Sequence, residues 1–171
     1  MTSLAITVVG HDRPGIIARA AEALAGCGMN LEDSSMTLLR GHFAMTLICD
    51  GEAGADVVEA ALAPLAGAGL DVAVRPVAPE PEPERAASSH LVTVYGADRL
   101  GIVARLATVV AEAGGNITDL TTRLSGDLYV LLAEVDLPGD ADRDALAARL
   151  DAVSAELGVE TTLRDVENDQ L

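Results

Sequence analysis

The spacing of hydrophobic residues changes along the chain in a fixed order that occurs twice. Leu4–Val9 is rich in β-branched residues, which is typical of a strand. Apolar residues then recur at helical spacing from Ile16 to Leu24. The pattern next predicts two strands, a helix and a strand: Asn30–Leu39, Phe43–Asp50, Ala55–Ala66 and Leu70–Val77. The order of elements is therefore βαββαβ.

The second occurrence is a repeat of the first. A shift of 86 residues aligns Ala5–Asp50 with Leu91–Asp136, and 16 of the 46 aligned positions are identical. The repeat continues with a predicted helix, Asp142–Leu157, and a predicted strand, Val159–Val166. We therefore expect two homologous domains, 1–77 and 90–167. The segment between them, 78–89, alternates proline and glutamate, which favours an extended linker.

The element order predicts the fold class. A strand–helix–strand unit followed by a hairpin produces an antiparallel four-stranded sheet with both helices on one face. We expect an α+β protein made of two ferredoxin-like βαββαβ domains. In each sheet the first and third strands should be central, and the second and fourth should form the edges.

The helix ends carry recognisable capping residues. Asp12 is expected to be the N-cap of the first helix, with Pro14 in an early-turn position. Four glycines are expected to end the first helix of each copy in the left-handed conformation: Gly26, Gly28, Gly114 and Gly115.

The third strand of each copy is apolar on both faces, unlike a strand with one face in water. In the first copy, Phe43 and Met45 alternate with Ala44 and Ile48. Apolar surface of this extent indicates an interface. We expect the two domains to pack on each other, on a second chain, or both, with a homodimer as the expected assembly.

The charge restricts the partners. The chain has 27 acidic and 11 basic residues, a net charge of −16, and every basic residue is arginine. The absence of lysine excludes Schiff-base and phosphate-loop lysines. The negative charge argues against direct binding to nucleic acid, which requires a basic face.

Nothing in the sequence resembles a secretion signal or a membrane span. The two cysteines, Cys27 and Cys49, are too few for a disulfide framework. We expect a cytoplasmic protein with reduced thiols and no membrane contact.

The residues kept in both copies cluster where the first strand leads into the first helix, at 10–15 and 96–101. Backbone amides at a helix start lack partners within the helix and favour an anion such as a carboxylate. A second conserved position between the copies is an asparagine, Asn30 or Asn116, whose amide suits a zwitterion. The same residues also suit turns and helix caps, so ligand binding and architecture remain alternatives at this point.

The motifs G-x-D-R-P-G-I-[IV] and G-x-N-[LI]-x-D resemble the ACT domain, a small regulatory module that binds amino acids. The resemblance covers both copies and is strongest to tandem ACT proteins of the glycine cleavage system transcriptional repressor type. It implies pairing through sheets and first helices, with amino-acid effectors held between the strand-to-helix loop of one domain and the asparagine region of its partner.

The expected ligand contacts lie in both copies. The resemblance implies Asp12, Arg13, Pro14, Gly15 and Asn30 in the first copy, and Asp98, Arg99, Gly101 and Asn116 in the second. His11, which precedes the first loop, is added as a further contact. The second copy departs from the motif at Leu100, where the first has Pro14, and at Ala97.

No other motif predicts chemistry. The three histidines stand singly, without the spacing of a zinc site, and no nucleophile is paired with a base. We expect no cofactor, no metal and no catalysis. The leading hypothesis is a non-enzymatic regulator that binds a small amino acid and signals to a protein partner. This partner is either a regulator or an enzyme. The hypothesis includes a role in the transcriptional control of amino-acid metabolism. The alternative is an interaction module without a ligand.

Overall fold

The computed structural model describes residues 1–78 and 87–166. The chain divides into two compact units, Met1–Glu82 and Pro83–Leu171, which we call the first and the second domain. The predicted linker, 78–89, lies for the most part outside the described residues, and its last two residues already belong to a strand.

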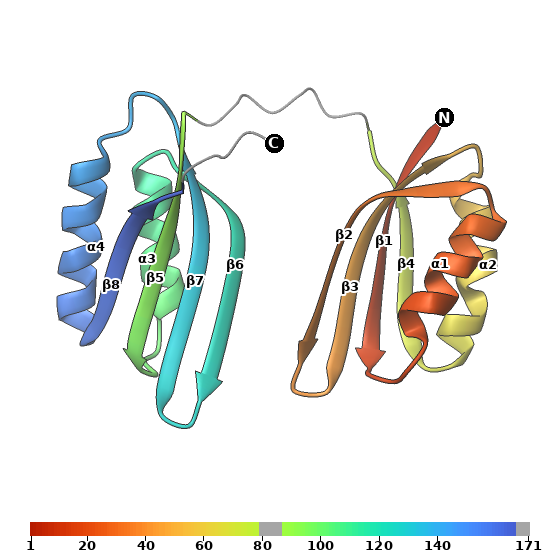
Figure 1. Cartoon of the computed structure of the whole chain (residues 1–171), viewed down its shortest axis with the longest axis horizontal. Coiled ribbons are helices and arrows are strands. Elements are labelled where there is room, and N and C mark those ends of the chain that lie inside the picture. Colours follow the sequence, from red (N-terminus) through yellow and green to blue (C-terminus); the bar gives the residue numbers. More distant parts are fainter. Residues whose placement is uncertain (79–86, 167–171) are drawn as a thin grey trace. The chain divides into compact units, whose positions relative to one another are not determined.

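Each domain has the predicted βαββαβ order (Figure 1). The elements of the first domain are β1 (Thr2–His11), α1 (Ile16–Gly26), β2 (Met29–Leu39), β3 (His42–Gly51), α2 (Ala55–Gly67) and β4 (Leu70–Pro76). Those of the second are β5 (Ser88–Ala97), α3 (Ile102–Glu112), β6 (Asn116–Ser125), β7 (Leu128–Leu137), α4 (Arg143–Leu157) and β8 (Val159–Asp165).

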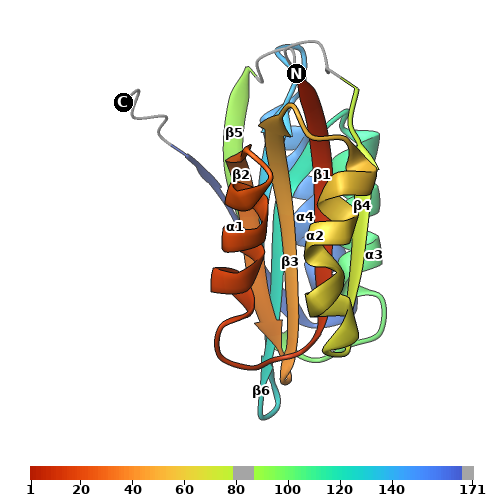
Figure 2. The same ribbon diagram turned by 90° about the vertical axis from the view of Figure 1, so that its right-hand side faces the viewer.

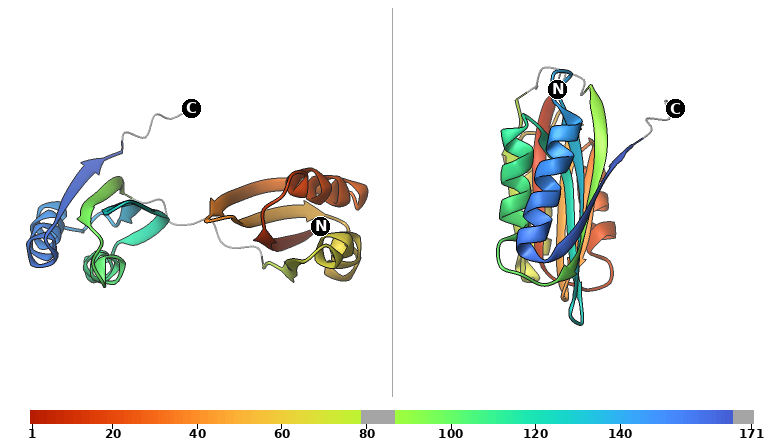
Figure 3. Two further views of the ribbon diagram at one scale, coloured as in Figure 1. Left: turned by 90° about the horizontal axis from the view of Figure 1, so that it is seen from below. Right: turned by 90° about the vertical axis from the view of Figure 1, so that its left-hand side faces the viewer.

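The strand order confirms the ferredoxin-like arrangement. The two sheets have the orders β2-β3-β1-β4 and β6-β7-β5-β8, so the first and third strands of each domain are central. All pairings are antiparallel. Figure 2 shows α1 and α2 on one face of the first sheet, and Figure 3 shows α3 and α4 on one face of the second.

Each core lies between the sheet and its two helices. Alternate residues of the central strands are buried there, such as Leu4, Ile6 and Val8 in β1, because successive side chains of a strand point to opposite faces. Leu24 of α1 and Leu62 of α2 complete the same cluster in the first domain. Aliphatic side chains therefore do most of the packing, as the low aromatic content requires.

The prediction that Asp12 caps the first helix is wrong. The helix begins at Ile16, its N-cap is Gly15, and no side chain caps it. Gly15 has a φ of 91°, and Gly101 at the equivalent position has a φ of 94°. A residue in this left-handed region cannot lie inside a right-handed helix, so the helix cannot extend back to place Asp12 at its N-cap.

The glycines at the ends of the first helices have different roles. Gly28 and Gly114 have φ values of 71° and 73° and form the predicted left-handed ends. The prediction is wrong for Gly26, which is the last helical residue, and for Gly115, which is not left-handed. A Cβ atom on Gly115 would lie 2.8 Å from Leu137 Cδ2, so close packing explains that glycine.

Large apolar side chains remain exposed in both domains. The edge strands and the first helices contribute several of them: Ile17, Leu31, Met36, Leu38 and Leu39 in the first domain, and Val103, Leu120 and Leu124 in the second. The outer faces of the central strands add Val9, Tyr95 and Leu132. No helix within 1–78 or 87–166 is both long and apolar enough to cross a membrane.

Candidate functional site

The loop between β1 and α1 presents an uncapped helix start. Residues 12–15 connect His11, the last residue of β1, to Ile16. The first turn of α1 holds no acidic residue, and no side chain within 1–78 or 87–166 caps this helix start. The Asp12 backbone N–H donates to the Gly41 carbonyl oxygen over 3.0 Å, which holds the loop beside the β2–β3 turn. The positive end of the helix dipole and its free amides therefore favour an anion here.

Arg13 is the half-buried side chain of this loop. Its Nη2 atom is buried and has no hydrogen-bond partner in the part of the chain that the structure describes. His11, Asp12, Pro14 and Gly15 are exposed. The loop thus combines free backbone donors with one guanidinium nitrogen that lacks an acceptor among the described residues.

The equivalent loop of the second domain is more open. Asp98 and Arg99 are exposed, and Gly101 is half-buried. Together with Leu100 and Tyr129 they line a shallow hollow of about 500 Å³ at the start of α3. Arg99 is exposed and therefore does not reproduce the buried, unpartnered Nη2 atom of Arg13.

His11 and His42 form a pair that sequence reasoning missed. They lie opposite each other on β1 and β3, with ring centroids 4.9 Å apart. Their proximity depends on the strand register, which the isolated positions in the sequence do not reveal. Among residues 1–78 and 87–166, no group of three or more potential metal ligands comes together.

The asparagine region lies at the other end of the first sheet. Asn30 is opposite Asp50, and Asp50 is opposite Ser3 on its other side, so the three residues share one face of the sheet. Asn30 is exposed and its Nδ2 donates to Glu32 Oε1 over 2.6 Å. We call Ser3, Asn30 and Asp50 the asparagine corner of the first domain.

Asp50 was not predicted as a site residue, yet it is the residue of this corner whose buried oxygen lacks a hydrogen bond to any described residue. Its Oδ1 atom is buried and has no hydrogen-bond partner among the described residues. The side chain lines a hollow of about 450 Å³ together with Met1, Ser3 and Pro76. A carboxylate in such surroundings favours a cationic or hydrogen-bond-donating group.

The second domain repeats this corner with one difference. Asn116 is opposite Asp136, and Asp136 is opposite Ser89. Here the Ser89 hydroxyl donates to Asp136 Oδ1 over 2.6 Å, so the carboxylate has a partner within its own domain.

Within each domain the structure separates the two groups of predicted residues. The asparagine corner is level with Ser3 on β1, and the loop follows His11 at the opposite end (Figure 1). Gly10 is seven positions after Ser3 on an extended strand, which corresponds to about 23 Å. A single domain therefore cannot place its own loop and its own asparagine on one small ligand.

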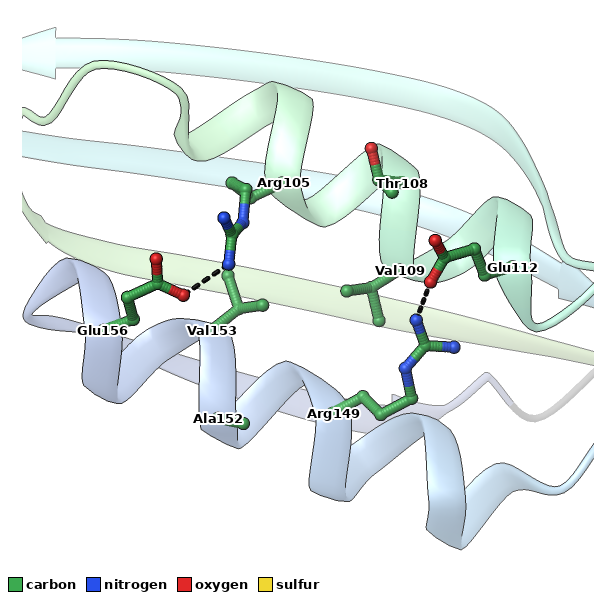
Figure 4. A pocket seen from close by; sticks show the side chains of 8 residues that line it. All are labelled: Arg105, Thr108, Val109, Glu112, Arg149, Ala152, Val153 and Glu156. Carbon is green, nitrogen blue, oxygen red and sulfur yellow. Dashed lines mark hydrogen bonds and ion pairs between the residues drawn. The ribbon is translucent and has the colours of Figure 1, made fainter.

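A further hollow of about 390 Å³ lies between α3 and α4. Figure 4 shows its charged side chains joined in two ion pairs, Arg105 with Glu156 and Arg149 with Glu112. Because these charges satisfy one another, this hollow is less suited to an ionic ligand than the corners described above.

Comparison with known proteins identifies relatives of the whole chain. A family model described as the ACT domain matches residues 2–74 and 89–164. The glycine cleavage system transcriptional repressor of Escherichia coli is 27% identical over 175 aligned residues, covering 98% of this chain and 92% of the relative. A UPF0237 protein of Methanosarcina mazei is 33% identical over 78 residues, covering 45% of this chain and 85% of the relative.

A crystal structure of a protein from Galdieria sulphuraria has a TM-score of 0.80 and 28% identity to this chain. The match covers 96% of this chain and 98% of that protein. The similarity in sequence and structure thus extends over both domains.

Proposed function

We propose that this chain, which belongs to the ACT domain family, is a non-enzymatic regulator that binds a small amino acid. The ligand binds where the loop of one ACT domain meets the asparagine corner of another. Its occupancy is passed to a protein partner in the control of amino-acid metabolism. The full-length similarity to a glycine cleavage system transcriptional repressor supports a regulatory role.

The observation that carries the proposal is the chemistry of the two ends of the first sheet. One end offers free helix-start amides beside Arg13, which favour a carboxylate. The other offers Asn30 and the Asp50 carboxylate, which favour an ammonium group. These are the two charged groups that every free amino acid carries.

The mode of signalling follows from the separation of these ends. A ligand that needs groups from two domains binds only when the two domains are packed together. Binding therefore shifts the population toward the packed arrangement, and a partner that recognises this arrangement responds to the amino acid. With a net charge of −16, any transcriptional effect is exerted through a protein partner rather than through direct contact with DNA.

The test is thermal unfolding in the presence of each common amino acid, added singly at millimolar concentration. A ligand present at 100 times its dissociation constant stabilises the folded protein by about 2.7 kcal/mol, so at least one amino acid should raise the unfolding temperature clearly. An unchanged unfolding temperature with every amino acid would instead favour an interaction module without a ligand.

A double variant then tests the site. Asn30→Ala with Asn116→Ala should abolish the shift while leaving the unliganded protein folded, since both asparagines are exposed and the Asn30 side chain bonds Glu32 alone among the described residues. The control is Glu59→Ala, an exposed position of α2, which should keep the full shift. Unchanged ligand affinity in the double variant would show that the asparagines are not ligand contacts.

A further inference from the structure

Two of the three histidines of the chain face each other at one end of the first sheet. His11 and His42 are directly opposite in the register of β1 and β3, and their ring centroids lie 4.9 Å apart. Both side chains are exposed to solvent. His90 is different, because it is buried and its two ring nitrogens lie within hydrogen-bond distance of Asp165 and Ser88. The facing pair therefore offers two imidazoles to a ligand from solvent.

The spacing of these two rings suits two ligands of one metal ion. An imidazole nitrogen binds zinc at about 2.0–2.1 Å, so the centre of the ring lies about 3.2 Å from the ion. Two such rings, at an angle of about 90–109° around the ion, have centres about 4.5–5.2 Å apart. The 4.9 Å between His11 and His42 falls inside this interval. Their interplanar angle of 33° is compatible with chelation, because each ring can rotate about its own bond to the metal.

The backbone holds the two histidines in place. Arg40 and Gly41 form the turn between β2 and β3, with φ values of 50° and 83°, and a tight two-residue hairpin turn of type I′ requires positive φ at both positions. The Asp12 N–H donates to the Gly41 carbonyl oxygen over 3.0 Å, which ties the residue after His11 to the residue before His42. An ion bound by one ring therefore finds the other close by, and little order is lost on chelation.

The type of ligand selects the class of metal. Imidazole nitrogen suits Zn²⁺, Ni²⁺ and Cu²⁺, whereas Mg²⁺ and Ca²⁺ prefer oxygen. A net charge of −16 attracts every divalent cation, so the preference among cations comes from the two rings rather than from the charge. Two rings fill only two of the four or more positions around such an ion, which leaves the others to water or to a small chelating molecule.

The second domain shows that the fold does not require a histidine pair at this place. Ala97 and Leu128 occupy the equivalent positions of β5 and β7, where they are opposite each other and exposed. The same sheet thus forms with alanine and leucine. Folding alone does not account for the two histidines of the first domain.

We propose that His11 and His42 bind one transition-metal ion of the zinc, nickel and copper class, and that this facing pair is sufficient for the site. The ion joins the end of β1 to the start of β3. The site goes beyond the proposed function and does not depend on it, because the histidines bind the ion without an amino acid. It also departs from the expectation of no metal, since the strand register brings together histidines that are single in the sequence.

The first experiment is calorimetry with Zn²⁺ on the full chain without a purification tag. The original protein should bind one ion per chain, and Mg²⁺ at the same concentration should give no saturable binding. His11→Asn and His42→Asn should each weaken zinc binding at least about tenfold, because loss of either ring removes the chelate. Cys27→Ser is the control for zinc binding by a thiol, since Cys27 is half-buried and free, and it should bind like the original.

The second experiment builds the same site in the second domain. A chain that carries both Ala97→His and Leu128→His has facing histidines on β5 and β7 as well. It should bind two zinc ions, whereas each single variant should still bind one. These variants keep the net charge of the chain at −16 with neutral histidines, so a second ion reports the added rings and not added negative charge.

Circular dichroism of each metal-free variant should show an unchanged fold, because all four positions are exposed. Absence of saturable zinc binding to the original protein would overturn the proposal and leave the two rings only in contact with each other. Full zinc affinity in both His11→Asn and His42→Asn, or its loss in Cys27→Ser, would place the ion elsewhere and overturn it too. A single ion in the chain with added histidines would refute the sufficiency of the facing pair. Amino-acid binding is measured separately, without added metal, so the proposed function stands or fails on its own.

Discussion

The buried imidazole of His90 lies with its Nδ1 atom 3.0 Å from Oδ1 of Asp165, on the neighbouring strand. His90 takes the position in the second domain that Leu4 takes in the first, and both side chains are almost fully buried. The other ring nitrogen, Nε2, lies 2.8 Å from the Ser88 hydroxyl oxygen. Both polar atoms of the ring are thus satisfied, which is the condition for burying a histidine at a core position.

Asp165 makes the stability of the second domain depend on pH. The hydrogen bond from Arg143 Nε, 2.8 Å long, lowers the pKa of this carboxyl group from its ordinary value of 3.8, and the contact with His90 acts in the same direction. A group whose pKa is lowered by folding stabilises the protein above its unfolded pKa, and this contribution is lost as the pH falls through the folded pKa.

Asp165→Asn should therefore lower the unfolding midpoint at pH 7, and the difference from the original protein should shrink as the pH falls below 3.8. Urea unfolding followed by circular dichroism across this range measures it. Asp151→Asn, on the exposed side of α4, is the control and should keep the original pH profile. A constant difference at all pH values would show that the ionised carboxylate is not what stabilises this contact.

Gly51 is required because the chain passes close to it. A Cβ atom there would lie 2.4 Å from Met29 Sδ, 2.7 Å from the Gly28 carbonyl oxygen and 3.1 Å from Met29 Cα. Since two of these neighbours are backbone atoms, Gly51→Ala should destabilise the first domain by about 1–3 kcal/mol in urea unfolding. Gly26→Ala is the opposite case, because a Cβ atom there would meet no described atom within 4 Å apart from its own helix and chain neighbours, and the residue is helical. It should stabilise by up to about 1 kcal/mol, and a loss of stability would contradict the helical assignment.

The loops before the two first helices have the same backbone although one contains proline and the other leucine. Gly15 has φ and ψ of 91° and 4°, and Gly101 has 94° and 3°. Leu100 is fully exposed, so its side chain contributes no packing. Leu100→Pro should therefore be neutral or stabilise by up to about 1 kcal/mol through the unfolded state.

The measurement for Leu100→Pro is again urea unfolding, with Leu106→Ala as a contrasting variant. Leu106 is buried in α3, and its truncation should cost about 2–5 kcal/mol. A destabilisation above about 1 kcal/mol in Leu100→Pro would show that the two loops differ in the backbone of residue 100.

Most of the fold could be predicted because it depends on local periodicity. The alternation in β1 and the helical spacing from Ile16 to Leu24 identify their elements without any knowledge of distant contacts. The second copy of the repeat then predicted the same βαββαβ order of elements from different residues. The left-handed conformation of Gly15 could not be predicted in this way, because glycine permits positive φ without requiring it.

The candidate site was only partly predictable, since its charged partners are distant in sequence. Asp50 meets Asn30 and Ser3 only through the strand register, and the burial of its oxygen depends on the folded corner. One signal was present: Ser3 and Asp50 are identical to their counterparts Ser89 and Asp136 in the repeat. The difference between the two corners lies in side-chain placement, which identical residues cannot reveal.

The capping of α4 and of α1 provides a last pair of opposite expectations. Asp142 is the N-cap of α4, and its side chain accepts a hydrogen bond from the Ala145 amide over 2.9 Å. Asp142→Ala should therefore destabilise the second domain by about 1 kcal/mol.

Asp12 precedes α1 in a similar sequence context but does not cap it, because Gly15 occupies the N-cap. Asp12→Ala should leave the free energy of unfolding of the unliganded protein unchanged, as measured by urea unfolding. A loss as large as that of Asp142→Ala would place the start of α1 at Asp12 after all, and the helix-start amides offered to the ligand would then already be occupied.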